Sequence, residues 1–232
     1  MWMISEACRP VAGVASWNSL PARQQQGLLP QLQEEERVRL ADRYRVCPAR
    51  TPFQLGMASM LVRRMYAWRG YRSDVGPYPV DDPNRLTLAA WHADSVVATL
   101  TVGRDSAAGL LADSLYAEEL AQLRRPGRVV CELSRLAVDP DFSSRELLLQ
   151  LLRAAHRYGR ATFAASDVVI EVNPRHARYY QRSFGFRQLG SLRRCPRVDA
   201  PAVLLHRALE DFALHPPNPC SLQSRTSSLV AS

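Results

Sequence analysis

The chain has 232 residues, which is enough for one domain of ordinary size with additional terminal segments. Hydrophobic residues make up 47% and charged residues 22%, a balance that indicates a folded globular protein rather than a disordered or fibrous one. The formal net charge is +8. The sequence contains no Lys, so its positive charge comes from Arg. A basic surface suits nucleic acid, anionic membranes and acidic proteins alike, so charge alone does not choose a partner.

The sequence carries no recognisable targeting or metal-binding pattern. Residues 1–17 lack a basic start and their apolar run is interrupted by Arg9, so we expect no cleaved secretory signal. No run approaches the roughly 18 apolar residues of a membrane span, which restricts any membrane contact to a peripheral one. The five cysteines form no C-x-x-C pair and the five histidines no H-E-x-x-H spacing. We therefore expect reduced thiols, a cytoplasmic location and no metal.

The two ends of the chain differ in composition from its middle. Residues 1–33 mix Pro, Gly, Gln and Ser without a sustained period, and residues 213–232 are rich in Pro and Ser, so both are predicted to be poorly ordered. The expected domain is therefore 34–212. Within it, apolar positions recur at helical spacing over 34–46 and 53–69, which predicts two helices.

From residue 86 the pattern becomes that of strands. Residues 86–92 and 95–103 are rich in β-branched residues and are separated by Ala93-Asp94, which predicts a hairpin. A short helix is then expected over 114–125, with Asp113 as its N-cap.

The next three elements are expected to form a strand–helix–strand unit. Pro126-Gly127 turns the chain into a strand over 128–138, and a helix follows over 144–161. The strand 167–172 (DVVIEV) is mostly apolar and lacks alternation, which indicates burial on both faces. The two strands are therefore predicted to pair in parallel.

The C-terminal part is expected to complete a mixed α/β sheet. Asn173-Pro174 suits the start of a helix over 176–184, which Gly185 would end in a left-handed conformation. Two further strands are predicted over 186–194 and 202–209.

A strand ending in LAVDP, a long helix, a buried strand and a helix closing on Tyr180-x-x-x-Phe184-Gly185-Phe186 together resemble the GNAT superfamily of acyltransferases. Within it, the sequence is most similar to the FeeM-type N-acyl amino acid synthases, which are relatives of the LuxI-type acyl-homoserine-lactone synthases. The segments that carry this resemblance are MLVRRMYAWRGY (60–71), ATLTVGRDSAAGLLADSLYAEEL (98–120), CELSRLAVD (131–139), IEVNPRHARYYQRSFGF (170–186) and CPRVDAPAVLL (195–205). The resemblance implies a mixed sheet with two splayed parallel strands flanked by helices.

The resemblance also implies an activity. FeeM-type enzymes move a long-chain acyl group from the phosphopantetheine thioester of an acyl carrier protein to the α-amino group of an amino acid, without a tightly bound cofactor. GNAT enzymes that use acetyl-CoA usually carry R/Q-x-x-G-x-G/A after the LAVDP-like strand, where glycine lets backbone amides wrap the pyrophosphate. Residues 141–146 contain no glycine, which favours a carrier-bound donor, with acyl-CoA as the alternative co-substrate.

Two residues are candidates for the chemistry. Glu132 lies within an apolar strand, where burial would raise its pKa and suit it to accept a proton from an ammonium group. Arg135 could hold the α-carboxylate of an amino acid by two parallel hydrogen bonds. Strand alternation would place the two on opposite faces, so their cooperation requires a β-bulge. The structural alternative is an ion pair in which Arg135 neutralises Glu132.

The resemblance implies further contacts with the acyl donor. The pantetheine arm would lie between the two parallel strands, with the backbone amides of Leu136 and Val138 facing the thioester oxygen. Tyr180 or Tyr179 would protonate the departing thiolate, although a core aromatic explains either residue equally well. The other candidate contacts are Asn173, His176, Ser134, Ser143, Ser144, Arg145, Thr99 and Thr101. Asn173 also suits a purely structural role as a helix cap.

Two arginine triplets suit an acidic carrier protein, and both also suit a solvated helix face. They are Arg153, Arg157 and Arg160, and Arg175, Arg178 and Arg182. The arginines lack a nucleic-acid recognition pattern, so no nucleic acid partner is expected.

Three other functions remain open on sequence: an acyl-homoserine-lactone synthase, an acyl-CoA-dependent N-acyltransferase, and a non-catalytic GNAT domain that binds an acyl or thioester ligand. The pattern leaves the acyl length, the amino acid and the oligomeric state open.

Overall fold

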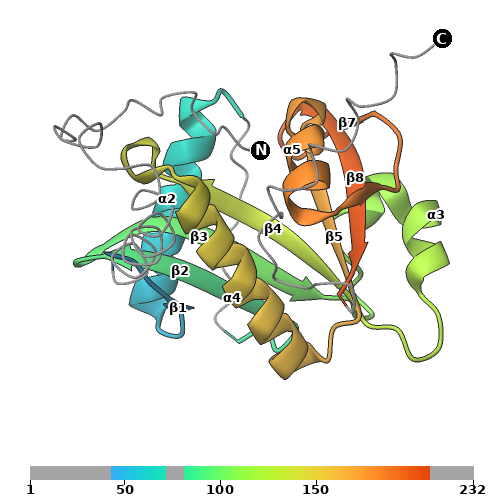
Figure 1. Cartoon of the computed structure of the whole chain (residues 1–232), viewed down its shortest axis with the longest axis horizontal. Coiled ribbons are helices and arrows are strands. Elements are labelled where there is room, and N and C mark those ends of the chain that lie inside the picture. The colour runs from blue at the N-terminus through green and yellow to red at the C-terminus, as the bar shows by residue number, and fades with distance from the viewer. Residues whose placement is uncertain (1–42, 72–80, 210–232) are drawn as a thin grey trace, which may run out of the picture.

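The structure is a computed structural model that describes residues 43–71 and 81–209 (Figure 1). The predicted terminal segments, 1–33 and 213–232, lie outside the described residues. In the described part of the chain, an eight-stranded mixed sheet forms the centre of the fold. Its strands are β1 (Arg45–Pro48), β2 (Arg85–His92), β3 (Ser95–Arg104), β4 (Val130–Val138), β5 (Asp167–Val172), β6 (Arg187–Gln188), β7 (Arg193–Cys195) and β8 (Ala200–Ala208).

The strand order is β1-β2-β3-β4-β5-β8-β6, and β7 pairs with β8 outside this path. The predicted hairpin is present, because β2 and β3 pair in antiparallel fashion on either side of Ala93-Asp94. Strands β4 and β5 pair in parallel, as predicted from the strand–helix–strand pattern. The other pairings among the described strands are antiparallel, so the sheet is mixed.

The helices cover both faces of this sheet (Figure 1). They are α2 (Pro52–Trp68), α3 (Asp113–Leu123), α4 (Arg145–Phe163) and α5 (Pro174–Phe184), with a short 3-10 helix at Pro140–Phe142. Helices α4 and α5 share one large core cluster with the sheet, whereas α2 and α3 each bury a smaller cluster. Because these clusters use alternate residues of the strands, α4 and α5 lie on one face and α2 and α3 on the other.

Local sequence signals explain where the helices begin and end. Thr51 and Gln54 form a capping box at the start of α2. Ser144 caps α4 by accepting a hydrogen bond from the amide of Leu147. Asn173 caps α5 in the same manner, and Gly185 ends it with φ of 66°.

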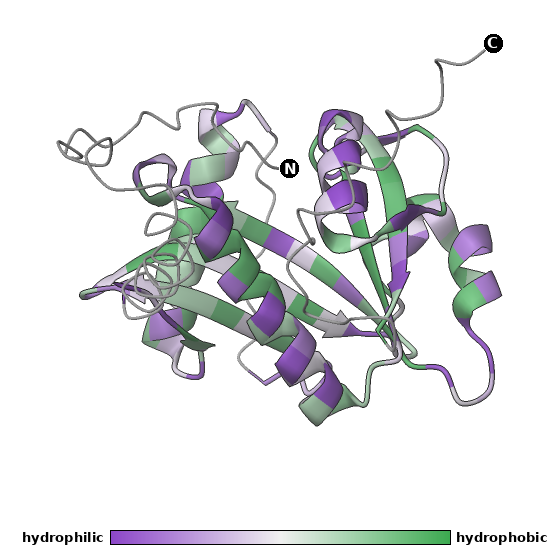
Figure 2. Cartoon of the chain, viewed as in Figure 1, coloured by the Kyte–Doolittle hydropathy of each residue, from purple (hydrophilic) through white to green (hydrophobic). Residues whose placement is uncertain are grey.

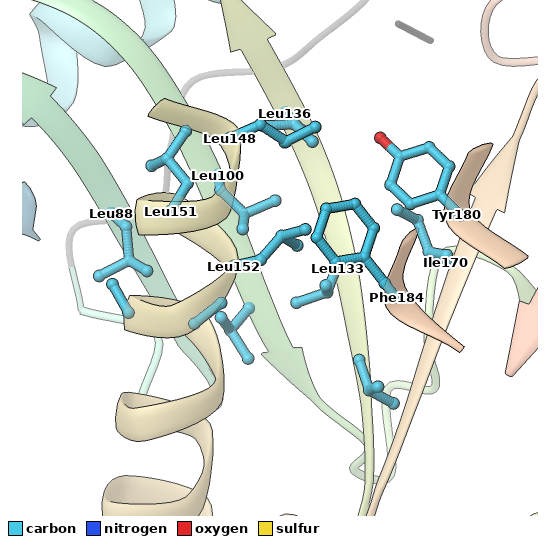
Figure 3. Packing of buried hydrophobic residues seen from close by; sticks show 14 of the residues in the cluster. Leu88, Leu100, Leu133, Leu136, Leu148, Leu151, Leu152, Ile170, Tyr180 and Phe184 are labelled. Carbon is cyan, nitrogen blue, oxygen red and sulfur yellow. The ribbon is translucent and has the colours of Figure 1, made fainter. Parts of the chain in front are cut away.

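The main core lies between the sheet and helices α4 and α5. Helix α4 presents its apolar side to the sheet and its arginine-rich side outward, visible as alternating green and purple bands in Figure 2. Figure 3 shows Leu151 and Leu152 of α4 against Leu88 and Leu100 of the sheet, with Leu133 of β4 nearby. This packing fixes α4 across β2, β3 and β4.

An ion-pair cluster joins β4 and β5 where the two strands begin. Arg128 donates two hydrogen bonds of 2.7 Å to the buried carboxylate of Asp167. Ser166 and His206 also contact this carboxylate, at 2.7 and 2.9 Å. Because a buried charge is tolerated only when it is paired, these contacts compensate the burial of the Asp167 carboxylate at the closely paired end of the two strands.

Three local expectations are wrong. Residues 45 and 46, predicted as the end of a helix over 34–46, belong to β1. Of the rest of that segment only residues 43 and 44 are described, and residue 43 is helical. Asp113 is not the N-cap of α3, because Ala112 holds that position. The Asp113 carboxylate instead accepts from the amide of Leu110 and from Arg124.

The predicted strand over 186–194 is also wrong in part, because it is divided into β6 and β7. The break falls around Gly190, where a Cβ atom would lie only 2.5 Å from the ring of Tyr116. The Tyr116 hydroxyl lies 3.1 Å from the carbonyl oxygen of Ser191. The close passage of the chain over this ring therefore interrupts the strand.

Candidate functional site

Strands β4 and β5 separate halfway along their length. Their parallel pairing ends at Leu133 and Ile170, although β4 continues to Val138 and β5 to Val172. Figure 1 shows the two strands together at one end and diverging toward the other. The splayed parallel strands expected from the resemblance are therefore present.

A β-bulge in β4 accompanies this separation. The register with β3 changes from Thr101 opposite Ser134 to Thr99 opposite Ala137, which leaves one extra residue on β4. Arg135 lies in the bulge with φ of 48°, in the left-handed region. A bulge bends its strand and reverses the alternation of side chains. This is the feature that cooperation between Glu132 and Arg135 requires.

A cavity of about 530 Å³ lies at the point where the strands separate. It is bounded by β4, β5, the loop before α3, the segment from β7 to β8, and Tyr66 of α2. Five predicted residues line it: Glu132, Ser134, Arg135, Leu136 and Asn173. Glu132 and Arg135 therefore face the same cavity.

Glu132 is buried, with 3% of its surface exposed. Its Oε2 atom accepts a hydrogen bond of 2.7 Å from the amide of Leu111. Burial raises the pKa of this carboxyl to about 7, and the positive charge of Arg197 and the Leu111 amide limit the rise. A group with this pKa exchanges protons readily near neutral pH.

Two further charged residues contribute to the cavity wall. Arg197, in the turn between β7 and β8, donates a hydrogen bond of 2.8 Å to Glu171 on β5. It also donates to the carbonyl oxygen of Leu111. Cys195 lies beside Glu171, and burial raises the pKa of its thiol.

The amides of the separated part of β4 are directed into the gap. The amide of Asp139 donates to the carbonyl oxygen of Val97 on β3 at 2.8 Å. Because amide directions alternate along a strand, the amides of Val138 and Leu136 are directed away from β3 and toward β5. Leu136 also lines the cavity, whereas Val138 does not.

Tyr180 lies on the other face of the sheet, within the α4–α5 core. It is 1% exposed and does not line the cavity. Figure 3 shows its hydroxyl directed from α5 toward Leu136 on β4. This hydroxyl has no hydrogen-bond partner among the described residues, and burial holds its pKa well above the usual value for tyrosine.

Tyr179 packs edge-on against Tyr180, with ring centroids 5.7 Å apart. Burial raises the pKa of Tyr179, while Arg145 and Ser183 oppose that rise. Tyr179 therefore lies beside the N-terminus of α4 rather than in the cavity.

The remaining predicted contacts lie in three places outside the cavity. Ser143, Ser144 and Arg145 lie where the 3-10 helix meets α4, and His176 accepts a hydrogen bond from Arg175 in the first turn of α5. Burial and the charges of Arg175 and Arg69 lower the pKa of His176 to about 4.

Thr99 and Thr101 are buried in β3, and Thr101 pairs with the hydroxyl of Thr87 at 3.0 Å. They do not line the cavity.

Sequence reasoning did not identify Arg197, Glu171 or Leu111. Glu171 interrupts the apolar run 168–172, and that charge in a buried strand was a usable signal. Arg197 lies in the segment CPRVDAPAVLL, which contributed to the resemblance without any residue in it being assigned a role.

No group of three or more His, Cys, Asp or Glu side chains suited to a metal ion occurs among residues 43–71 and 81–209. In the same part of the chain, no helix combines the length and apolar character needed to cross a membrane.

Comparisons with known proteins agree with this architecture. A family model described as N-acyl amino acid synthase FeeM matches residues 57–208. The chain is similar to the solved structure of FeeM, an N-acyl amino acid synthase from uncultured soil microbes, with 24% sequence identity and a TM-score of 0.67 over 73% of this chain and 94% of that chain. No curated protein sequence matches the chain.

Two other solved structures are similar at lower identity. An acyl-CoA N-acyltransferase from Pseudomonas aeruginosa has 18% identity and a TM-score of 0.51 over 71% of this chain and 98% of that chain. The AHL synthase LasI has 16% identity and a TM-score of 0.51 over 72% of this chain and 89% of that chain. These likenesses confirm the predicted GNAT fold.

Proposed function

We propose, from the premise that this chain belongs to the N-acyl amino acid synthase FeeM family, that it moves a long-chain acyl group from acyl carrier protein to the amino group of an amino acid. The family and the fold make the chain an acyltransferase. The observation that carries the finer proposal is the buried Glu132 in a cavity at the separation of β4 and β5. The reaction is proposed to occur in the cytoplasm.

The two substrates are proposed to approach from opposite faces of the sheet. The cavity with Glu132 is closed by Tyr66 of α2 and by the loop before α3, so it lies on the face of α2 and α3. Tyr180 belongs to the face of α4 and α5. An amino acid in the cavity and a thioester arm between α4 and α5 would therefore meet in the gap between the strands.

The chemical steps follow from this arrangement. The carboxylate of Glu132 accepts a proton from the substrate ammonium, and the neutral amine attacks the thioester carbonyl carbon. The amides of Leu136 and Val138 stabilise the oxyanion of the tetrahedral intermediate. The carbon–sulfur bond then breaks and the Tyr180 hydroxyl protonates the departing thiolate. The resulting tyrosinate takes the second proton, which the nitrogen loses as the amide forms, and Glu132 releases the first proton to solvent. Arg135 binds the carboxylate of the amino acid.

The loop before α4 supports a carrier-bound donor over free acyl-CoA. Residues 141–146 contain no glycine, and the Ser144 side chain already accepts the hydrogen bond of the Leu147 amide at the helix start. A pyrophosphate needs several free backbone amides at such a position. The single phosphate of a carrier-bound phosphopantetheine makes a smaller demand on this loop.

The arginines of α5 support docking of an acidic carrier near the gap. Arg175 lies two residues after Asn173, which lines the cavity, and Arg178 and Arg182 follow on the outer side of the helix. None of these three arginines forms an ion pair with another residue in the described ranges. Such a concentration of positive charge attracts acidic proteins.

The arginines of α4 lie in a different place. Arg153, Arg157 and Arg160 line a separate depression with Tyr44 and Val46 of the β1 region. This depression shares no residue with the cavity at β4 and β5. The structure therefore favours α5 over α4 as the docking surface.

Charge reversal on the two helices tests this assignment. Arg175→Glu with Arg178→Glu is expected to raise KM for acyl carrier protein by about 10-fold, because like charges then face the carrier. The matched variant Arg153→Glu with Arg157→Glu is expected to change it by less than about twofold. Turnover of a small acyl-pantetheine thioester should be the same in all three proteins. Equal losses in the two variants, or a larger loss in the α4 variant, would exclude docking on α5.

The proposed function is tested by comparing donors and acceptors directly. Purified protein is incubated with a long-chain acyl group on holo acyl carrier protein or on coenzyme A, together with the common amino acids, and the products are identified by mass spectrometry. N-acyl amino acids formed from the carrier-bound donor are expected. Lactones that appear only with S-adenosylmethionine would identify a homoserine-lactone synthase. N-acyl amino acids formed from acyl-CoA but not from the carrier-bound donor would show that acyl carrier protein is not the donor. Absence of any acyl transfer would contradict the proposal.

A further inference from the structure

A chain of contacts links Glu171 to Glu132 through Arg197 and one peptide unit. Arg197 donates through Nη2 to Glu171 at 2.8 Å and through Nη1 to the carbonyl oxygen of Leu111. The amide of the same Leu111 donates to Oε2 of Glu132 at 2.7 Å. These contacts join β4, β5, the loop before α3 and the turn before β8 around the cavity.

The contacts of Arg197 differ from those of a surface arginine. Its partner Glu171 has a side chain that is only 10% exposed. Its neighbour Arg194 pairs instead with Asp199 at 2.7 Å, on side chains that are 69% and 53% exposed. An arginine fork that binds two acceptors at once fixes both of them in space. Arg197 therefore holds the Leu111 loop against β5, and this loop holds Glu132.

We propose that Arg197 is a positioning residue for Glu132, held in place by Glu171, and that this pair of opposite charges sets the pH at which the enzyme becomes active. The inference rests on the proposed role of Glu132 as proton acceptor. The positive charge of Arg197 favours the carboxylate form of Glu132, and the negative charge of Glu171 disfavours it. Removing either charge should shift the titration of Glu132, and the two shifts should have opposite signs.

Among residues 43–71 and 81–209, few other ionisable groups line the cavity. They are Arg135 on β4 itself, Tyr66 on α2 and Cys195 on β7. The loop before α3 contributes only backbone amides to Glu132. Among the groups from the neighbouring elements, Arg197 and Glu171 are the two whose charges act on the pKa of Glu132.

The sign of each shift follows from the charge that is removed. Wild-type activity should rise with pH through a midpoint near the pKa of about 7 of Glu132, because the base acts in its ionised form. Arg197→Met should move this midpoint upward by about one pH unit and lower kcat about fivefold at neutral pH, with recovery in alkaline buffer. Glu171→Gln should move it downward by about half a unit.

A lysine at position 197 separates charge from geometry. Arg197→Lys keeps the positive charge but loses the planar fork, so the midpoint should stay within about 0.3 pH units while the plateau of kcat falls several-fold. Arg194→Met is the matched control, because Arg194 lies in the same strand–turn region without touching Glu132, Glu171 or Leu111. It should leave both midpoint and plateau unchanged.

A second readout keeps this inference separate from the proposed function. The carboxyl carbon of Glu132 can be followed by NMR in isotope-labelled resting protein, with the signal assigned by its loss in Glu132→Gln. Opposite shifts of its titration in Arg197→Met and Glu171→Gln would support the inference even if the donor were misassigned. Shifts of the same sign, or no shift in either folded variant, would overturn it.

Discussion

Replacing Glu132 by Gln is expected to lower kcat for acyl transfer by about 1000-fold, because the substrate ammonium then has no internal acceptor for its proton. Gln has the same shape and can still accept the hydrogen bond from the Leu111 amide, which lies 2.7 Å from Oε2 in the structure. The fold should therefore persist. The measurement is the initial rate of free thiol release from the acyl donor.

Binding and stability are the controls for this variant. The Kd for the amino acid should change by less than about 10-fold, because Arg135 and the cavity wall remain in place. The thermal midpoint should not fall, since replacing a buried carboxyl whose pKa is raised removes an ionisable group from an apolar site. A rate within about fivefold of the wild type would show that Glu132 is only a structural carboxylate.

Replacing Tyr180 by Phe is expected to lower kcat by about 100-fold while leaving stability unchanged or slightly higher. The Tyr180 hydroxyl is buried and has no hydrogen-bond partner among the described residues, so its removal breaks no hydrogen bond with them. Its loss therefore removes a desolvated polar group. Burial raises the pKa of Tyr180 well above the usual tyrosine value, which keeps the hydroxyl protonated until a thiolate forms beside it.

Tyr179→Phe is the matched control, because Tyr179 lies next to Tyr180 on the same helix but packs beside Arg145. It should retain kcat within about threefold. Urea unfolding of both variants and turnover with carrier-bound donor give the comparison. If Tyr180→Phe keeps full turnover, or if Tyr179→Phe loses more, the proton donor is not Tyr180.

The elements with strong local signals were predicted well from sequence. Helices α2, α4 and α5 and strands β2 to β5 lie within a few residues of their expected bounds. Their signals are short in range: the helical spacing of apolar residues over 53–69, the Asn173-Pro174 start of α5, and the apolar run within β5. Such signals act on the chain before any tertiary contact forms.

The errors in the fold arose where tertiary contacts override the local pattern. Residues 45–48 pair with β2 as an edge strand despite the helical spacing of the preceding residues. The predicted strand over 186–194 is interrupted because Gly190 passes over the ring of Tyr116, a contact across more than 70 residues. Neither contact can be read from a local window of sequence.

The candidate site was only partly visible in the sequence for a similar reason. Glu132 and Arg135 were selected because they are charged residues within an apolar strand whose segment, residues 131–139, carries the family resemblance, and a bulge between them was predicted as the condition for their cooperation. Arg197 could not be selected, because its importance depends on Glu171 and Leu111, which lie 26 and 86 residues away in the chain. The cavity exists only once these segments have come together.

The central claim is that the gap between β4 and β5 admits the thioester arm of the acyl donor. The most direct test is a crystal structure with a stable amide analogue of acyl-pantetheine. The account predicts that the arm passes between the two strands, with the amide oxygen within about 3 Å of the Leu136 or Val138 amide and the acyl carbonyl facing Glu132. An arm bound outside the gap, with no part of the ligand between β4 and β5, would contradict it.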